Sequence, residues 1–594
     1  MKNRINKRNS ARITSFTEWI TVLVVIIVVN VLANVFYKRV DLTAEKRYTL
    51  SSTANELCSK LEKKGEKLYF KLYLDGEMSP RFRQLRDEIR DLAYEFREAS
   101  GKIIEIEVSN PFENKQPSEI TPIMEDFASR GLFAVRDIED ESGDQLKIKQ
   151  LIPAAELHYG DKTVAINFYQ LDIALDPAEN IQKAIDNLEY EIANGLRQCA
   201  LEKPKKIVFA DGNNEMTDDR IKAFAVELSK YYSISKLNLN LADPEAGMPF
   251  VADLEKANPD SVGLILMEKI QSRLNNNDLL VISKPESDYN MAELYLIDQF
   301  MLKGGKVLWM IDPVVAEIDS FENSSSIMAL PRGIENIESL LFDYGVKLEN
   351  TLLSDILCNA IPIPVGGRPD LVDFTYFPVF TSAGLTHPIT KNLGMVWSQF
   401  ASTLSVKPTN NLSVTPLLTS SPNTKIINPP ATIDLQSVYM QSRDDNYKNS
   451  LRAGTKLTGV LLEGNFKSYF VNHRKYTRLP FKEKGKSKMI VIADGDIIRN
   501  YTSKKGMIAP TGYDKFTKNT FANKTFLMNC IDYLIDDNGL IEIRAKEKMV
   551  RLLDKEKIRI EKTFYQWFNM IAPIVSILLF GLSNVVLRRW KYQR

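Results

Sequence analysis

The chain has 594 residues and a formal net charge of +1, and 44% of its residues are hydrophobic and 26% charged. These are ordinary proportions for globular protein, the length predicts about two or three domains, and a charge near zero gives no reason to expect a nucleic-acid partner. Four dispersed cysteines and only three histidines exclude a disulfide scaffold and a histidine-rich metal site, so neither a metal nor another cofactor is expected.

The first predicted element is an apolar segment from Trp19 to Tyr37 (WITVLVVIIVVNVLANVFY), which is long enough to cross a bilayer as a helix. The preceding tail, residues 1–18, is basic and is therefore predicted to be cytoplasmic. A cleaved signal peptide is the alternative, but the apolar run exceeds a usual signal core, which favours an uncleaved anchor. Asn30 and Asn34 lie one helical turn apart, so they are expected to share a face that packs against a neighbouring membrane helix.

Residues 38–178 are predicted to form a thioredoxin-like α/β domain. A strand, an amphipathic helix and a second strand follow one another as in a β-α-β unit, and a hairpin comes after them. The redox motif CxxC is missing, so a redox role is excluded. The elements are expected at Thr53–Lys64, Leu68–Leu74, Pro80–Ala99, Ile104–Val108, Ala155–Tyr159 and Thr163–Phe168.

Residues 179–544 are predicted to form a larger, doubly wound α/β domain of the Rossmann or flavodoxin-like kind. Short apolar runs that end in polar residues recur in it, which is typical of strands buried on both faces of a parallel sheet. These strands are expected at Lys206–Ala210, Leu279–Ser283, Lys306–Ile311 and Met489–Ala493, after a helix at Asn180–Leu201. Crossover helices are expected at Met216–Ser233, Tyr289–Leu302, Ile334–Tyr344 and Asn519–Ile535.

The polar residues that follow these strands form the candidate site. Because the carboxyl ends of parallel strands meet at one edge of a sheet, a ligand is expected to bind there. Asp and Gly after a strand are also ordinary turn formers and helix caps, and this structural interpretation is the favoured one. The candidate ligand-binding edge consists of Asp211, Gly212, Asn213, Asn214, Glu215, Asp312, Asp494 and Asp496.

No catalytic motif accompanies this edge. None of the predicted strands ends in the nucleophile motif GxSxG. The segment Gly485-Lys486-Ser487 lacks the earlier glycine that a phosphate-binding loop requires. The chain is therefore expected not to be an enzyme.

The last predicted elements lead back to a membrane. Residues 545–567 have high helix propensity and are expected to form a juxtamembrane helical stalk. The segment 568–587 (FNMIAPIVSILLFGLSNVVL) is long enough to span a bilayer, and the basic tail 588–594 predicts a cytoplasmic C-terminus. With both tails cytoplasmic, the chain between the two spans is expected to lie outside.

Several short motifs follow one another in a set order along the chain, namely Asp41–Thr43, Tyr48–Ser51, Asp278–Pro285, Leu296–Asp312, His387–Thr390, Val491–Asn500 and Asn529–Arg544. In this order, between two apolar segments, they resemble the GldG-type gliding-motility ABC transporter auxiliary proteins, named in that family as substrate-binding subunits. Members of the wider family show Gly-His-Gly-Glu where this chain has Gly212–Glu215, so no histidine role is transferred. The resemblance implies a complex with a separate ATPase and a multi-span permease in a bacterial inner membrane, a large periplasmic domain and a role in gliding. No substrate follows from it.

Three classes of function remain open from the sequence. The leading one is a non-enzymatic extracytoplasmic subunit of an ABC-type transporter complex. The second is a stand-alone envelope receptor that binds a glycan or a peptide at the polar edge, and the third is a hydrolase with an unrecognised site. Two membrane helices are too few to form a transport path, which favours the first class.

Overall fold

The chain falls into two compact units, Tyr48–Lys546 and a second unit made of Met1–Arg47 with Glu547–Arg594. The predicted tail 1–18 and most of the predicted span Trp19–Tyr37 lie outside the described residues, and the few described there, 21 and 23–28, are helical and exposed. The computed structural model describes residues 21, 23–28, 49–141, 145–169, 176–200, 205–229, 231–240, 259–365, 368–381, 386–391, 393–407, 411–471, 480–503, 506–536 and 555–592.

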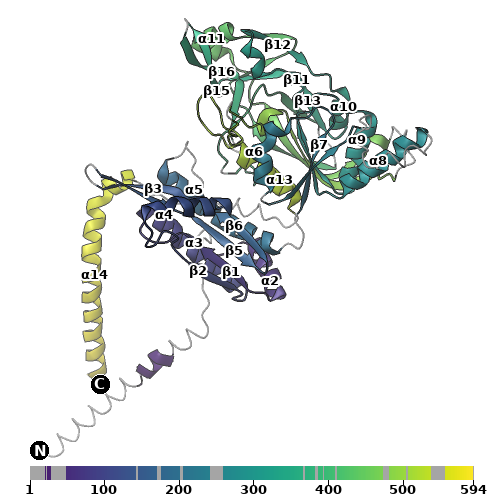
Figure 1. Cartoon of the computed structure of the whole chain (residues 1–594). Coiled ribbons are helices and arrows are strands. Elements are labelled where there is room, and N and C mark those ends of the chain that lie inside the picture. The colour runs from purple at the N-terminus through teal and green to yellow at the C-terminus, as the bar shows by residue number, and fades with distance from the viewer. Residues whose placement is uncertain are drawn as a thin grey trace, which may run out of the picture. The chain divides into compact units, whose positions relative to one another are not determined.

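The N-terminal part of the large unit is built on a mixed four-stranded sheet (Figure 1). Its elements are α2 (Ser52–Lys64), β1 (Leu68–Leu72), α3 (Pro80–Ala99), β2 (Ile104–Val108), α4 (Pro117–Ser129), β3 (Val135–Glu141), β4 (Gln145–Leu151), β5 (Ala154–Tyr159), β6 (Lys162–Asn167) and α5 (Pro177–Ala200). The strand order is β2-β1-β5-β6, with β1 parallel to β2 and antiparallel to β5. β5 and β6 form a hairpin, and β3 pairs with β4 in a separate ribbon.

Local sequence accounts for the helices of this part. The hydroxyl oxygen of Ser51 accepts a hydrogen bond from the backbone N–H of Ala54 at 3.2 Å, so it caps α2. In α3 the apolar residues Phe82, Leu85 and Ile89 recur every three or four positions, and all three are buried against the sheet.

The rest of the large unit is built on a nine-stranded sheet. Its helices and parallel strands are β7 (Lys206–Asp211), α6 (Asp218–Ser229), β8 (Ser233–Asn238), α8 (Pro259–Asn275), β9 (Leu279–Ser283), α9 (Met291–Leu302), β10 (Lys306–Met310), β23 (Lys484–Ile492) and α13 (Asn523–Ile535). β23, β10, β9, β7 and β8 lie side by side in this order, and every neighbouring pair among them is parallel. The mixed α/β class predicted from the sequence is confirmed.

A long β-rich segment separates β10 from β23. It contains β11 (Val314–Val315), η2 (Ile318–Glu322), β12 (Ser326–Pro331), α10 (Glu335–Asp343), β13 (Val346–Glu349), β14 (Leu352–Asp355), β15 (Cys358–Val365), β16 (Arg368–Phe380), β17 (Val396–Trp397), β18 (Thr403–Val406), β19 (Leu412–Thr419), β20 (Thr424–Ile427), β21 (Ala431–Asp434), α11 (Leu435–Arg443), α12 (Asp445–Ser450), β22 (Leu457–Lys467) and η3 (Tyr469–Val471). β22 pairs antiparallel with β23 and extends the sheet towards β18 and β13.

Two of the predicted crossover helices differ from what the structure contains. The helix predicted at Met216–Ser233 ends as α6 at Ser229, because Ser233 already begins β8, a strand that the sequence did not reveal. The helix predicted at Ile334–Tyr344 is α10, but it leads into β13, which pairs antiparallel with β18 at the far side of the sheet. α10 therefore does not connect two parallel strands.

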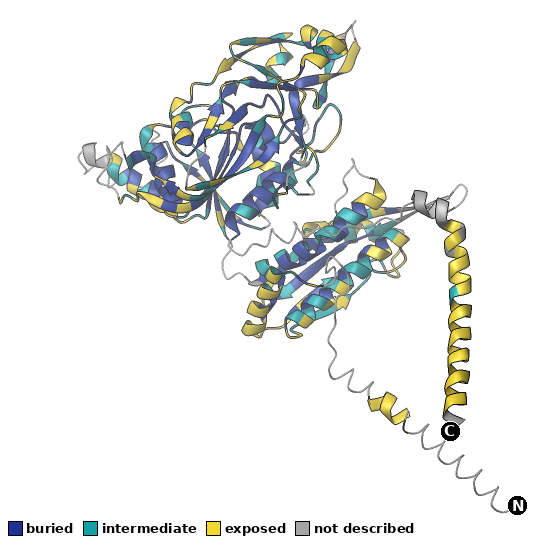
Figure 2. Ribbon diagram, turned by 180° about the vertical axis from the view of Figure 1, so that it is seen from behind, coloured by how far each residue is buried: buried dark blue, intermediate teal, exposed yellow. Residues whose placement is uncertain are grey.

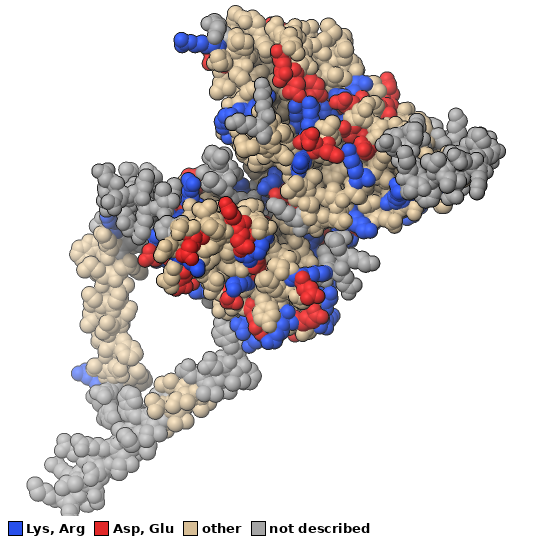
Figure 3. Space-filling view, viewed as in Figure 1, with Lys and Arg blue, Asp and Glu red and all other residues tan. Residues whose placement is uncertain are grey.

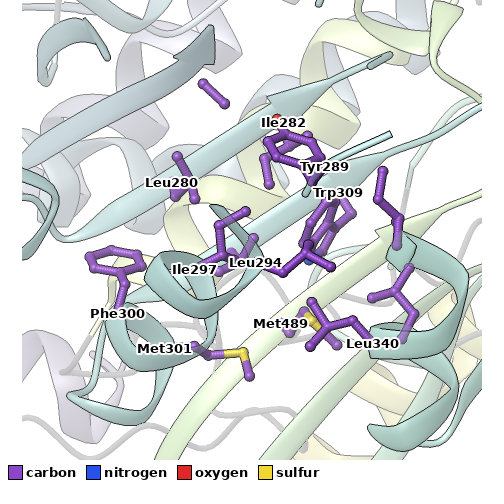
Figure 4. Packing of buried hydrophobic residues seen from close by; sticks show 14 of the residues in the cluster. Leu280, Ile282, Tyr289, Leu294, Ile297, Phe300, Met301, Trp309, Leu340 and Met489 are labelled. Carbon is purple, nitrogen blue, oxygen red and sulfur yellow. The ribbon is translucent and has the colours of Figure 1, made fainter. Parts of the chain in front are cut away.

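The large sheet is buried on both faces, as the apolar runs predicted. Along β9, Leu280 and Ile282 belong to one core, whereas Leu279 and Val281 belong to the core on the opposite face. Figure 4 shows the first core, in which α9 lies over the sheet and the ring of Tyr289 lies near that of Trp309. These two rings meet edge to face with centroids 6.2 Å apart.

A buried polar cluster joins the two parts of the large unit. The carboxylate of Asp532 in α13 accepts hydrogen bonds from the hydroxyls of Tyr190 in α5 and Tyr232, both at 2.5 Å. Burial alone lowers the pKa of Arg197 in α5, but Tyr232, Asp532 and Tyr190 outweigh it and raise this pKa above its usual range. We call Tyr190, Arg197, Tyr232 and Asp532 the Asp532 cluster.

The second unit contains α14 (Lys555–Tyr592), one continuous helix of 38 residues. At 1.5 Å per residue it is about 57 Å long, nearly twice the thickness of a hydrocarbon core. Among the described residues its segment Gln566–Leu587 is long and apolar enough to cross a membrane, and none of it is buried (Figure 2). The predicted stalk 545–567 is helical from Lys555 onwards, and its first part lies outside the described residues.

Candidate functional site

The carboxyl edge of the large sheet carries two separate groups of polar side chains. Because β7, β9, β10 and β23 are parallel and in register, the residues that follow them lie at one edge. Contacts bring together Asp312, Asp494 and Asp496 after β10 and β23, whereas residues 211–215 after β7 make their own set of contacts. The eight residues predicted as one edge are therefore split into two groups.

The first group is organised around a buried lysine that the sequence analysis did not select. Lys284 follows β9, and its Nζ lies 3.1 Å from Asp312 Oδ2, 2.6 Å from Asp496 Oδ2 and 2.6 Å from Glu317 Oε1. Its side chain is only 3% exposed. We call Lys284, Asp312, Glu317, Asp496 and the neighbouring Arg499 the Lys284 cluster.

The backbone conformation of Lys284 and the lack of a side chain at Gly495 allow the buried position of the lysine. Lys284 has a φ of +50°, an uncommon conformation for a residue with a side chain. Its backbone N–H donates to the carbonyl oxygen of Met310 at 2.8 Å, which continues the pairing of β9 with β10. A Cβ added at Gly495 would lie 2.6 Å from Cβ of Lys284, so only glycine leaves room for the lysine stem there.

Arg499 extends the cluster towards the surface. Its Nη2 lies 2.7 Å from Asp319 Oδ2, and its Nη1 lies 3.6 Å from Asp496 Oδ1. Arg220 in α6 reaches the same Asp319 oxygen at 3.2 Å. Acidic and basic groups thus alternate from the buried lysine to the partly exposed Asp319.

The pKa directions follow from these contacts. Burial alone lowers the pKa of Lys284, but the carboxylates of Asp496, Asp312 and Glu317 outweigh it and hold the pKa above its usual range. For Asp496, burial raises the pKa, but Lys284 and Arg499 outweigh it, so this pKa is lowered. For Asp312, burial raises the pKa and outweighs the opposing effect of Lys284.

Asp494 lies beside the cluster, and no lysine or arginine among the described residues forms an ion pair with it. It is fully buried, and its pKa is raised well above the usual range by burial and by the nearby Asp312 and Asp496. Its Oδ1 accepts the backbone N–H of Asp496 at 2.8 Å, and its Oδ2 accepts that of Gln399 at 3.2 Å. Asp494 therefore shapes the turn after β23 and ties it to the β-rich segment.

The carboxylates of the cluster have the spacing of metal ligands. One oxygen from each of Asp312, Glu317 and Asp496 can be chosen so that all lie within 4.8 Å of one another, close enough for a cation. The ammonium group of Lys284 already contacts all three carboxylates at 3.1 Å or less. The lysine therefore takes the place that a metal ion would need.

The side chains of the second group, after β7, also form hydrogen bonds with other residues of the chain. Glu215 accepts hydrogen bonds from the backbone N–H of Asn213 at 2.8 Å and from the hydroxyl of Tyr289. The side-chain amide of Asn213 donates to Glu293 at 3.2 Å, and that of Asn214 donates to Ser287 at 2.9 Å.

The remaining two residues of this group act on the backbone turn. Asp211 is partly exposed and pairs with Lys236 at 3.3 Å. Gly212 has a φ of +109°, and a Cβ there would lie 2.2 Å from Asn238 Oδ1, so the turn requires glycine. These contacts hold β7 and β8 together, which is a structural role.

Sequence reasoning missed Lys284, Glu317 and Arg499. One signal was available for Lys284, because it directly follows the buried run LLVIS, where a charged residue requires a partner at the same edge. Glu317 and Arg499 follow no local pattern. Arg499 reaches Asp319 across 180 positions of sequence.

The face of the large unit seen in Figure 3 carries charges of both signs. Figure 3 shows acidic and basic side chains intermingled on the visible face of the large unit, without an extended patch of one sign. Of the five carboxylates predicted at the edge, those of Asp211, Asp312 and Asp496 pair with lysines of the same chain.

Comparisons with known proteins agree with the division of the large unit. A family described as "ABC-type uncharacterized transport system" matches residues 204–530, which begin just before β7 and end within α13. A second family, "Domain of unknown function (DUF7088)", matches residues 44–158 in the N-terminal part. An uncharacterized protein of Borreliella burgdorferi is 22% identical over 609 residues, which cover 99% of each chain. A solved structure titled "mmIFT52 N-terminal domain" covers 56% of this chain and 97% of its own, with 12% identity and a TM-score of 0.30, too low to indicate a shared fold.

Proposed function

Since the chain belongs to the family described as ABC-type uncharacterized transport system, we propose that it is a non-enzymatic, membrane-anchored auxiliary subunit of an ABC-type transporter complex. Its partners in this proposal are a multi-span permease and a separate ATPase. Following the resemblance to the GldG-type proteins, the complex supports gliding motility and lies in a bacterial inner membrane.

The observation that carries this proposal is α14. None of its apolar segment Gln566–Leu587 is buried, and Trp567 lies at one end and Trp590 just beyond the other, as in helices that cross a bilayer. Figure 3 supports this assignment, because the described surface of α14 is uncharged except for basic side chains towards its ends. One or two membrane helices anchor a protein but form no transport path, so a partner must supply the path.

The Lys284 cluster supports the absence of catalysis. An enzyme of this architecture would place reactive groups at the carboxyl edge of the parallel strands. Here the ammonium group of Lys284 pairs with the carboxylates of Asp312 and Asp496. The carboxylate of Glu215 accepts hydrogen bonds from Asn213 and Tyr289. The same observation weakens the alternative of a stand-alone glycan or peptide receptor that binds there.

The strand orders support the finer fold assignment. Numbered along the chain, the parallel strands β8, β7, β9, β10 and β23 lie in the order 2-1-3-4-5, which is that of flavodoxin-like folds. We assign the N-terminal part, with its parallel β1 and β2 joined through α3 and a hairpin on the far side of β1, to a thioredoxin-like fold.

Co-purification tests the complex. The full chain with a C-terminal affinity tag, extracted in mild detergent from its native host, is expected to bring down a multi-span permease and an ATPase in comparable amounts. An unrelated membrane protein with the same tag and one anchor is the control. Recovery of the chain alone, under conditions in which an ATPase and its permease stay associated, would contradict the proposal.

Reporter fusions test the topology, in which both termini are cytoplasmic and the chain from Val40 to about Lys562 lies in the periplasm. A reporter that is active only in the cytoplasm is expected to give a signal when fused after Arg594. The same reporter inserted at the exposed Asn323 is expected to give none, because that loop lies between the two spans. The reverse pattern would contradict the proposed orientation.

A further inference from the structure

The membrane-spanning part of α14 has one polar face. The segment Gln566–Leu587 contains five polar side chains, and at 100° per residue all five fall within a sector of about 100° around the helix axis. Pro573, Phe580 and Leu587 are the apolar residues in this sector, and the remaining circumference carries apolar residues and Gly581. The five polar residues, which we call the polar face, are Gln566, Asn569, Ser576, Ser583 and Asn584.

A polar face within a bilayer requires a partner. Side-chain amides and hydroxyls are costly against lipid, so in membrane proteins they pack against another helix and form hydrogen bonds across it. The hydroxyl of Ser576 donates its proton to the carbonyl oxygen of Ala572 at 2.8 Å. Its oxygen therefore remains able to accept a hydrogen bond from a neighbouring helix.

The chain itself contains a complementary segment. Within Trp19–Tyr37 the amides are those of Asn30 and Asn34, which the sequence predicts to share one helical face because they are four positions apart. Asparagine amides donate N–H groups, which is what the hydroxyl oxygen of Ser576 can accept.

The depths of these groups agree when the two spans are antiparallel. Asn30 lies 11 positions from Trp19, and Ser576 lies 11 positions from Leu587. With both segments helical, both residues would be about 16 Å from the cytoplasmic end of their spans. Asn34 lies 15 positions from Trp19 and meets the level of Ala572, which is 15 positions from Leu587. The small side chain of Ala572 permits a close approach of the two helices there.

We infer that the first apolar segment of the chain packs on the polar face of α14, with Asn30 opposite Ser576 and Asn34 opposite Ala572. The inference rests on the proposed function, because it requires both segments to span the membrane with both termini cytoplasmic. It adds that the two anchors form one antiparallel helix pair, so the large unit is held at both ends by a single membrane element.

Disulfide cross-linking in native membranes tests this pairing. The full chain carries Asn30→Cys and Ser576→Cys, a protease site inserted at the exposed Asn323, and a tag at each terminus. After oxidation and cleavage, the two fragments are expected to stay joined on a non-reducing gel. The control pair is Asn30→Cys with Leu578→Cys, which lies on the opposite face of α14 at nearly the same depth, and each single variant controls for the native cysteines. At least tenfold more joined fragment is expected from the first pair than from the control.

The other outcomes separate the pairing from the proposed function. Joining of two copies, or linkage of the Asn30→Cys variant to a different protein, would show that another helix occupies the polar face and would overturn the inference. Absence of any link, with the N-terminal tag retained in the membrane, would overturn the pairing and leave the two-span topology standing. Loss of the N-terminal tag from the mature chain would overturn both, because the first segment would then be removed.

A second variant tests the role of the asparagine amide. With Asn34→Cys and Ala572→Cys in one chain, the joined fragment is expected to form readily, and to decrease several-fold when Asn30→Leu is added. Replacing Asn30 by Gln, which keeps an amide, is expected to preserve more of the link than Leu does. Equal cross-linking by all three chains would show that Asn30 does not position the pair.

Discussion

Replacing Lys284 by methionine is expected to lower the free energy of unfolding of the large unit by about 3–5 kcal/mol. The methionine fills a similar volume but leaves Asp312, Glu317 and Asp496 buried side by side without the ammonium group that lies within 3.1 Å of each. Denaturant unfolding of the full chain in detergent, followed by tryptophan fluorescence, measures this loss.

The matched control for that variant is Lys236→Met. Lys236 also contacts two carboxylates, Asp211 and Asp218, but its side chain is 37% exposed. Exposed pairs contribute little, so a loss below about 1 kcal/mol is expected. Equal losses in the two variants would show that burial of the Lys284 cluster does not determine its importance.

The loss of unfolding free energy in the Lys284→Met variant is expected to depend on pH. Burial raises the pKa of Asp312 and of Glu317 in the intact protein, and removing the lysine removes an effect that lowers both. A carboxyl group whose pKa is higher in the folded than in the unfolded state stabilises the fold below its unfolded pKa, and this contribution is lost as the pH rises through the folded pKa. The difference between variant and parent is therefore expected to be smallest near pH 4 and to grow towards neutral pH. A difference that is the same at all pH values would contradict this account.

The second large effect is expected at the Asp532 cluster. Asp532→Ala removes the acceptor of two buried tyrosine hydroxyls, Tyr190 and Tyr232, and leaves the guanidinium of Arg197 without its carboxylate. Unpaired buried groups of this kind cost several kcal/mol together, and a loss of about 3 kcal/mol is expected. Because Tyr190 lies in α5 and Asp532 in α13, the link between the two parts of the large unit is expected to weaken as well.

Hydrogen exchange distinguishes this outcome from general destabilisation. Amides of α5 are expected to exchange faster in the Asp532→Ala variant, while those of the central strands β9 and β10 change less. The exposed Asp219 provides a control, since Asp219→Ala is expected to cost only a few tenths of a kcal/mol as a loss of charge at the start of α6. Uniform acceleration over the whole unit would contradict a local role for the cluster.

The sequence predicted the elements that have a local apolar pattern, and it missed those that depend on pairing with distant parts of the chain. β9 and β10 were predicted because continuous apolar runs reflect burial on both faces, and α3 because its apolar residues recur at helical spacing. β8 was missed because its sequence, SISKLN, has no such run, and β18 was missed because its four residues pair with strands far along the chain. Such strands form because they pair with strands that are distant in sequence. A short stretch of sequence does not contain those partners.

The candidate site shows the same limit. Asp312, Asp494 and Asp496 were selected because they follow parallel strands, and they do lie together. The residue that determines their chemistry, Lys284, contacts Asp496 across 212 positions of sequence. The sequence therefore indicated at which edge of the sheet the carboxylates lie. It did not indicate that a lysine of the same chain pairs with them.

The position of β23 has a consequence for how the chain is made. β10 is complete at Met310, yet the neighbour that covers its free edge, β23, begins only at Lys484, and β22 comes shortly before it. A chain emerging N-terminus first must therefore keep the apolar edge of β10 unpaired until nearly the whole β-rich segment has followed. Exposed edges of this kind are templates for aggregation, and closing so long a loop is slow. Nascent chains that stop within the β-rich segment should accordingly depend on chaperones, and assembly of the protein will be governed by the arrival of its last strand.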